Sequence, residues 1–507
     1  MKKILAVIIF IAFILSLIFF LRQTVSFSFV DEYDNIVAAY FMTKGKVLFT
    51  QVFHNRQPGM VWISYFIQSF LRPNSLYKLI VYHRLFVIGF SLVFSFFLAA
   101  RFQLVGVLFV LFYEILKYFS HGNLFQGESL AVYPLVYLFG LFLYKFTNKK
   151  IYAYEEILAA IFAWFIIFQR ETFVPVTLFV YFLILFKKSK SRGLSLAFFI
   201  VFSLSTLLFL PLKNYWYQLV TINSGYVVGE EIVRYGGYFV SLLKSFFYPL
   251  YTFVGFRMDE YNFYLIFISL SFLAVWFFLW KKRKKLRPVL LTAFFILGFS
   301  ILRPVEPKPF YAAYKIGSWS ALISFGTIYF ILEYLPKKYE KTRSAFIFFI
   351  IALFCLISVK RVFIETKNFN KVAVFDINYN RYFVNGEVVK ILADKNDTLY
   401  VDGYDSLVYW QADLPSAYEH IIFYPPFIHE PYFSAERMKM FTSFPPTFYY
   451  QDCFDKKTFV LPKSVMDKYS QWQFDKKGTC LFTLKSKLQN IPKSKLEEVK
   501  KFRYVIY

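Results

Sequence analysis

The segment that decides the fold is MKKILAVIIFIAFILSLIFFLRQTVSFSF, residues 1–29. Two lysines precede an apolar run over residues 4–21, and crossing a hydrocarbon core takes roughly 20 helical residues. The run ends in Leu-Arg-Gln and has no small-residue cleavage site after it. The segment therefore predicts an uncleaved signal anchor with its N-terminus in the cytoplasm.

The rest of the chain has the composition of a membrane protein. Its 507 residues are 58% hydrophobic and 23% aromatic, with 70 Phe and 40 Tyr, which excludes an ordinary soluble domain. The net charge of +26 would suit a nucleic-acid partner, but the Lys and Arg residues form short clusters between apolar runs. Charges in those places set membrane topology. The composition predicts a polytopic α-helical membrane protein with membrane lipids, and no nucleic acid, as partners.

About eleven apolar runs have suitable length for transmembrane helices. They lie at 4–21, 85–100, 102–118, 127–145, 152–169, 172–186, 194–212, 262–280, 288–303, 317–335 and 344–359. Alternation from a cytoplasmic N-terminus places the basic loops KFTNKK, KKSKSR, KKRKKLR and PKKYEKTR on the cytoplasmic side. This one assignment satisfies the positive-inside rule at every strongly basic loop.

Two further apolar segments compete with this count. Residues 59–71 are too few to cross comfortably, and residues 239–256 contain Lys244 and Pro249. Both are expected to be interfacial or re-entrant helices. The loops 22–83 and 213–261 then face away from the cytoplasm.

The tail, residues 362–507, differs from the membrane part, residues 1–361, in composition. Turn signals separate the strand-like runs DTLYVDG, KTFVLP and CLFTLKS, and helix-like stretches lie at 383–394 and 463–470. The pattern predicts a small extracytoplasmic α/β domain. Of three cysteines, Cys355 lies in an apolar run, while Cys453 and Cys480 either pair, if the tail lies in an oxidising compartment, or stay free.

Charged residues gather in the outward-facing loops and at span ends, where such residues usually have a function. The combination fits a reaction in which a carboxylate takes a proton from a hydroxyl nucleophile and cations hold an anionic leaving group such as a phosphate. A lipid-phosphate-linked sugar fits both needs. The acids are Asp31, Glu32, Asp34 and Glu128, and the bases are Arg56, Arg84, Arg170 and Lys308.

Each of these residues also has a simpler interpretation. An acidic pair directly after a span solvates the helix end, and an arginine at a span end extends to the headgroups. His54 has no second histidine at ligand spacing, so the sequence defines no metal site, and a divalent cation is left open as a cofactor. Lys308 and Tyr311 fit the aromatic and basic belt at a membrane interface.

Together the first-loop residues resemble the dolichyl-phosphate-mannose–protein mannosyltransferase-like family of membrane glycosyltransferases, which have the GT-C fold. The resemblance lies in Asp31-Glu32 followed by AAYFMTKGKVLFTQVFHNRQPGMVW, with Ala38 or Ala39, Gly45, Phe49 and the His54–Pro58 cluster. RLFVIGFSLV at Arg84, GESLAVYPLVYLFG, KPFYAAYKIGSWSALIS and the tail segment KNDTLYVDGYDSLVYWQADLPSAY are similar to the family as well.

The resemblance implies an inverting sugar transferase that uses a polyprenyl-phosphate-linked monosaccharide. It assigns the catalytic base to Asp31, with Glu32 as partner or substitute. NRQP occupies the place of the Glu-Lys-Pro-Pro stretch of the lipid A aminoarabinose transferases, so Arg56 takes the cation that approaches the donor phosphate. Asn55 stands where that subfamily has Glu, which argues against a lipid A acceptor. The segment from Lys308 to Tyr311 resembles another donor-phosphate contact.

Three functions follow from these features. The first is transfer of a sugar to a hydroxyl on a protein, lipid or glycan, at the outer face of a plasma membrane. A lipid-linked glycan polymerase is the second, although the 213–261 loop is only modestly basic. A lipid-linked glycan flippase or other transporter is the third, although the sequence shows no paired half-repeats.

Overall fold

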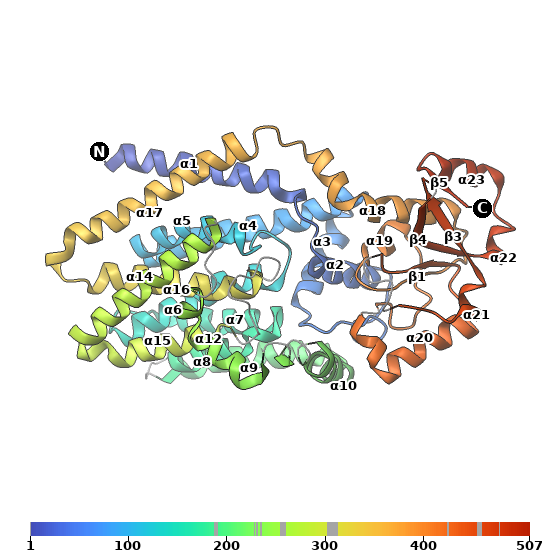
Figure 1. The fold of residues 1–507 in the computed structure, drawn as a ribbon. Helices are drawn as coiled ribbons and strands as arrows, with labels where there is room; N and C mark the ends of the chain where they lie inside the picture. The colour runs from blue at the N-terminus through green and yellow to red at the C-terminus, as the bar shows by residue number, and fades with distance from the viewer. Residues whose placement is uncertain are drawn as a thin grey trace.

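The computed structural model describes residues 2–186, 191–227, 229, 232–233, 236–253, 260–301, 313–422, 425–453, 459–475 and 477–506. A bundle of helices occupies one end of the molecule and a sheet-containing tail the other (Figure 1). The bundle helices are α1 (Lys2–Arg22), α4 (Leu76–Phe102), α5 (Leu104–Phe119), α6 (Gly127–Phe146), α7 (Ala153–Gln169), α8 (Val174–Phe186), α9 (Arg192–Leu208), α14 (Glu260–Lys282), α15 (Arg287–Phe299), α16 (Gly317–Tyr334) and α17 (Glu340–Lys360).

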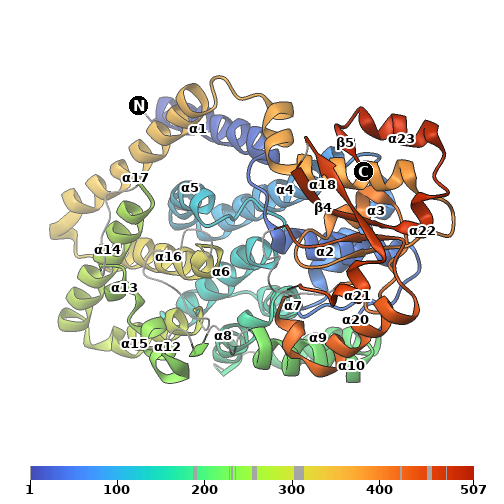
Figure 2. The ribbon, with the colours of Figure 1, turned by 45° about the vertical axis from the view of Figure 1, so that its right-hand side comes forward.

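Every one of the expected spans forms a helix, so the chain is a polytopic helical membrane protein. Six helices among the described residues (α1, α4, α6, α14, α16 and α17) are long and apolar enough to cross a membrane alone. The other five have 13 to 17 residues. In the bundle α16 packs against α5 and α6, and α1 runs beside α17 (Figures 1 and 2).

Both of the short apolar segments are helical in their described part. The first is α3 (Gly59–Leu71), and the second is divided into α12 (Gly237–Phe246) and α13 (Tyr248–Tyr251). One side of α3 is buried, whereas Phe66 and Phe70 are exposed. Such a helix suits a membrane surface. Helix α9 meets the segment beginning with α10 (Leu212–Trp216) at a bend of 102°.

The tail contains a five-stranded mixed sheet in the order β1-β2-β4-β3-β5. Strands β1 and β2 are parallel, and the other neighbours are antiparallel. The strands are β1 (Leu399–Val401), β2 (Phe448–Tyr450), β3 (Tyr469–Phe474), β4 (Lys477–Leu484) and β5 (Tyr504–Val505). The tail helices are α18 (Lys371–Leu392), α19 (Leu407–Ala412), α20 (Pro431–Ser443), α21 (Lys463–Met466), α22 (Lys485–Leu488) and α23 (Lys493–Lys500).

The expected elements of the tail are partly correct. DTLYVDG contains β1, CLFTLKS overlaps β4, and residues 383–394 largely coincide with the second half of α18. KTFVLP is wrong as a strand, because its described residues 459–462 form no strand. The helix expected at 463–470 is also too long. It ends at Met466, because the chain enters β3 at Tyr469 and pairs with β4.

Cys453 and Cys480 form a disulfide, which decides between the two states left open by the sequence. It links the segment that follows β2 to strand β4, and β2 and β4 are neighbours in the sheet. Cys355 is free.

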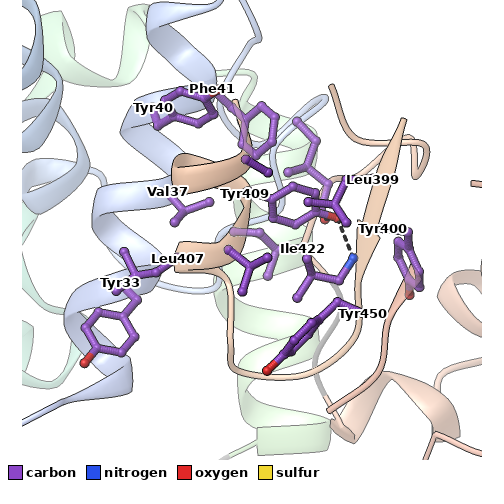
Figure 3. Packing of buried hydrophobic residues seen from close by; sticks show 14 of the residues in the cluster. Tyr33, Val37, Tyr40, Phe41, Leu399, Tyr400, Leu407, Tyr409, Ile422 and Tyr450 are labelled. Carbon is purple, nitrogen blue, oxygen red and sulfur yellow. Dashed lines mark hydrogen bonds between the residues drawn. The ribbon is translucent and has the colours of Figure 1, made fainter. Parts of the chain in front are cut away.

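A single apolar core joins the tail to the loop after the first span. That loop contains α2 (Val30–Thr43), and α19 packs along this helix. Val37 and Phe41 of α2 lie against Leu407 and Tyr409 of α19 (Figure 3). The Tyr409 hydroxyl in turn accepts a hydrogen bond of 3.0 Å from the Val401 amide of β1. The tail therefore buries one side of α2 and fixes its position over the bundle.

Candidate active site

Three acids lie in the first turns of α2, immediately after the extended residue Phe29. Carboxylates are favourable at a helix N-terminus, where the unpaired N–H groups carry partial positive charge. Neighbouring helical residues project about 100° apart, because a turn contains 3.6 residues. Asp31 and Glu32 therefore point in different directions, whereas Asp31 and Asp34 share a side.

Glu32 is fully enclosed. Its carboxylate accepts hydrogen bonds from Arg84 Nε and Nη2 at 3.0 and 2.5 Å, and from the Phe125 amide at 2.5 Å. The side chains of Glu32 and Arg84 are each 1% exposed. Arg84 also donates to the carbonyls of Ser26 and Phe27. This bidentate pair connects the start of α2 to α4 and to the segment before α6.

Asp31 has a different partner. Its Oδ1 lies 2.7 Å from Arg56 Nη2, and the same nitrogen lies 4.0 Å from Asp34 Oδ2. Arg56 also donates to the Asp31 carbonyl. The Asp31 side chain is 18% exposed and that of Asp34 5%, so Asp31 is the more accessible acid of the two. Burial lowers the pKa of Arg56, but the charges of Asp31 and Asp34 outweigh it and hold that pKa above its usual value.

Arg170 forms a further buried ion pair, with Glu128. Arg170, at the end of α7, places Nε 3.0 Å from Glu128 Oε1 and 3.6 Å from Glu171 Oε1. Two glycines permit the close approach of the helices. A Cβ on Gly59 would lie 2.4 Å from the Phe168 carbonyl oxygen, and one on Gly127 2.6 Å from that of Gln169. The starts of α3 and α6 therefore converge on the end of α7.

His54 is buried near these cations. Burial, with the charges of Arg56 and Arg170, lowers the pKa of His54 to about 3, so its imidazole is neutral at physiological pH. Its Nε2 has no hydrogen-bond partner among the described residues. A buried neutral imidazole of this kind can exchange a hydrogen bond with a bound molecule.

The loop that carries His54 and Arg56 is held by residues that the sequence did not single out. Gln218, in the π-helical segment Tyr217–Val227, accepts a hydrogen bond from the His54 amide at 2.9 Å and donates to the Phe49 carbonyl at 2.8 Å. Tyr215 donates to the Gln57 side chain at 2.8 Å. An amide and a phenol carry no sequence signal for such a role, because their partners lie more than 150 positions away.

The tail contributes Tyr404, which follows β1. Burial and the charges of Asp34 and Asp31 raise the pKa of Tyr404, so the acids of α2 act electrostatically on its hydroxyl. The residue is 40% exposed. The backbone before it passes tightly against Asp452, because a Cβ on Gly403 (φ +79°) would lie 2.1 Å from Asp452 Oδ2. No local pattern in the sequence points to Tyr404 either.

A mainly apolar cavity of about 1000 Å³ opens next to this cluster. Gln57 and Glu171, the neighbours of Arg56 and Arg170, belong to its polar lining, together with Thr172, Asn223, Ser241 and Ser245. Its other walls come from the ends of α7 and α9, the beginning of α8, α10 with the π-helical segment, and α12. Tyr215 lines this cavity and also donates the hydrogen bond to the Gln57 side chain.

The structure thus brings together Asp31, Asp34 and Arg56, with the Glu128–Arg170 pair and His54 nearby, and places Glu32 with Arg84 in a separate buried pair. Lys308 and Tyr311 lie outside the described residues. Among the residues that are described, no group of three His, Cys, Asp or Glu side chains could hold a metal ion.

Comparison with known proteins supports the fold. No family model matches the sequence, and no curated protein matches it. Among solved structures, ArnT from Cupriavidus metallidurans bound to undecaprenyl phosphate matches with a TM-score of 0.53 and 13% identity, covering 96% of this chain and 99% of that one. The apo structure of the same protein matches with a TM-score of 0.53 and 12% identity, over 95% and 98%. The GT-C fold expected from the first-loop resemblance is confirmed.

Proposed function

We propose that this protein is a membrane glycosyltransferase that moves a monosaccharide from a polyprenyl-phosphate-linked donor to an acceptor hydroxyl at the outer face of the membrane, with inversion. The observation that carries the proposal is the Asp31–Arg56 pair beside a large, mainly apolar cavity, whose lining includes Gln57, the residue after Arg56. A lipid phosphate needs a cation at an interface and an apolar channel for its chain. The matching ArnT structure holds undecaprenyl phosphate on the same fold, which supports this ligand class.

The residues divide into four roles. Asp31 is the base, because it is the accessible acid. Arg56 holds the donor phosphate, with Arg170 beside it. Glu32 and Arg84 act as positioning residues, because their charges are satisfied by each other and by backbone groups. His54 and Tyr404 border the space in which sugar and acceptor meet.

The proposed reaction is a substitution at the anomeric carbon of the sugar. The acceptor oxygen forms a bond to the anomeric carbon, and the bond from that carbon to the phosphate oxygen breaks. Asp31 takes the hydroxyl proton, and the electron pair leaves with the polyprenyl phosphate, whose charge Arg56 stabilises. Binding of the phosphate to Arg56 replaces the contact of this cation with Asp31, so donor binding itself frees the base.

The orientation follows from the same proposal. The basic loops lie on the cytoplasmic side, and the acid cluster and tail lie outside. The disulfide between Cys453 and Cys480 supports an oxidising location for the tail.

The test is a sugar-release assay on the purified full-length protein with radiolabelled polyprenyl-phosphate sugars. The matched variants are Asp31→Asn and Asp376→Asn, the second of which changes an exposed acid of α18. Turnover that is lost in Asp31→Asn and kept in Asp376→Asn, with donor binding retained in both, supports the proposal. Equal turnover in both variants, or movement of the donor across a vesicle membrane without release of sugar, contradicts it.

A further inference from the structure

A second cavity, of about 650 Å³, lies away from the acid cluster, between the C-terminal ends of α2 and α3 and the tail helices α18 and α19. Tyr40 lines it and lies nine positions after Asp31 on α2. At 1.5 Å and 100° per residue, this separation is about 13 Å along the axis and half a turn around it. The cavity is therefore on the opposite side of α2 from the proposed base.

One wall of the cavity contains a side-chain carbonyl oxygen that accepts no hydrogen bond from the described residues. Gln411 of α19 is 6% exposed, and its Nε2 donates to Glu387 Oε1. Its Oε1 has no hydrogen-bond partner among the described residues. Gly386 of α18 leaves room for this side chain, since a Cβ there would lie 2.4 Å from Gln411 Cβ. Because buried acceptors are nearly always paired, the carbonyl calls for a donor within the cavity.

The other walls combine fixed amides with aromatic rings. Gln68 is immobilised by donating to the Ile36 carbonyl at 2.8 Å and to Ser64 Oγ at 3.0 Å. Asn74 lies across the cavity on the turn before α4, and Trp410 and Phe383 contribute half-buried rings. Amide groups offer both donors and acceptors, and an aromatic ring offers a flat apolar face.

The charges of the lining nearly cancel. Three cations and two carboxylates line the cavity, and the Lys44–Asp413 pair closes at 2.8 Å. The cations of Lys44 and Lys390 lower the pKa of Asp413 against its partial burial, so this acid stays ionised and keeps Lys44 neutralised. An anion would find little uncompensated positive charge here, whereas a neutral molecule with many hydroxyl groups would find matching partners.

We propose that this cavity binds a neutral saccharide, with a sugar ring against Trp410 and a hydroxyl donating to Gln411 Oε1. The site is distinct from the Asp31 cluster and does not depend on the proposed transfer reaction. In an outward-facing tail it would retain glycan beside the enzyme.

Calorimetric titration of the full-length protein tests the proposal, with neutral oligosaccharides built from glucose, galactose, mannose and N-acetylglucosamine. Inorganic phosphate and phosphatidylglycerol vesicles serve as the anionic probes. Gln411→Leu removes the acceptor, Trp410→Ala removes the ring, and Trp276→Ala changes a half-buried tryptophan of α14, outside both cavities, as the matched control. Asn74→Ala changes an exposed residue of the loop before α4, so it tests the site even where a variant of a buried residue does not fold.

The expected result is binding of at least one neutral oligosaccharide, weakened about tenfold or more by Gln411→Leu, Trp410→Ala and Asn74→Ala but not by Trp276→Ala. Binding that all variants keep would overturn the proposal. So would binding of phosphate or phosphatidylglycerol alone, or no binding of any saccharide in the set.

Discussion

Asp31 and Glu32 are adjacent in the chain but bind different arginines: the partly exposed Asp31 binds Arg56, and the enclosed Glu32 binds Arg84. The helical rotation between neighbouring residues separates them. One acid of the pair is therefore partly exposed, and the other is enclosed between α2 and α4.

The first prediction concerns the accessible acid. Asp31→Asn keeps the size of the side chain and removes the base, so turnover should fall by about 10²–10⁴-fold. The unfolding temperature should change little, because Asp31 is partly exposed. A sugar-release assay together with thermal unfolding in the same detergent measures both. Unchanged turnover would remove Asp31 from the mechanism.

The second prediction concerns the enclosed acid. Glu32→Gln leaves the Arg84 guanidinium buried without its counter-charge, which costs about 3–5 kcal/mol. The variant should unfold at clearly lower temperature, in contrast to Asp31→Asn. Thermal unfolding of the two variants side by side measures the difference. Equal stability would show that the Glu32–Arg84 pair does not anchor α2.

The third prediction concerns Gln218, which holds the loop of His54 from a distance. Gln218→Leu removes both of its hydrogen bonds, so Arg56 should be less well placed and donor KM should rise about tenfold. Thr221→Val, at an exposed position of the same segment, is the matched control and should leave KM unchanged. In an Arg56→Gln background, Gln218→Leu should add no further increase in KM, because coupled residues are not additive. A merely structural role would lower stability equally in both backgrounds.

The fourth prediction concerns pH. The pKa of His54 falls from 6.5 in the unfolded chain to about 3 in the folded protein. Between these values the unfolded state binds more protons, so the stability contributed by neutral His54 is complete above the unfolded pKa and is lost as pH falls toward the folded one. Lowering the pH from about 7.5 to about 5 should therefore destabilise the wild type more than His54→Gln, as measured by thermal unfolding. An equal loss in both proteins would contradict the assignment.

The bundle could be predicted from sequence because hydropathy reports directly on burial in lipid. The limits of the expected spans agree with α4, α6 and α17 to within a few residues, except at the start of α4, which begins at Leu76 before the apolar run. The tail was harder to predict. Its strands are as short as two or three residues, and KTFVLP has strand propensity but no partner strand in its described part. Whether these segments form strands depends on the strands with which they pair, and the local sequence does not show those partners.

The candidate site shows the same limit. The charged residues of the first loop were found because charge is conspicuous in an apolar chain. The ion pairs that these residues form could not be predicted. They depend on which side of α2 each acid faces, and on two glycines that let the starts of α3 and α6 approach the end of α7. Gln218 and Tyr404 reach the site from distant parts of the chain and have no local signature.

The shared core of α2 and the tail sets an order of events during biosynthesis. Tyr40 donates to Asp413 across 373 positions of sequence, and Phe41 packs on Tyr409 of the same tail helix. At 5–20 residues per second, a ribosome needs roughly 20–75 s to make the intervening chain. During that time the apolar side of α2 lacks the tail residues that cover it in the folded protein. The packing around α2 can therefore be completed only after the tail helix α19 has been synthesised.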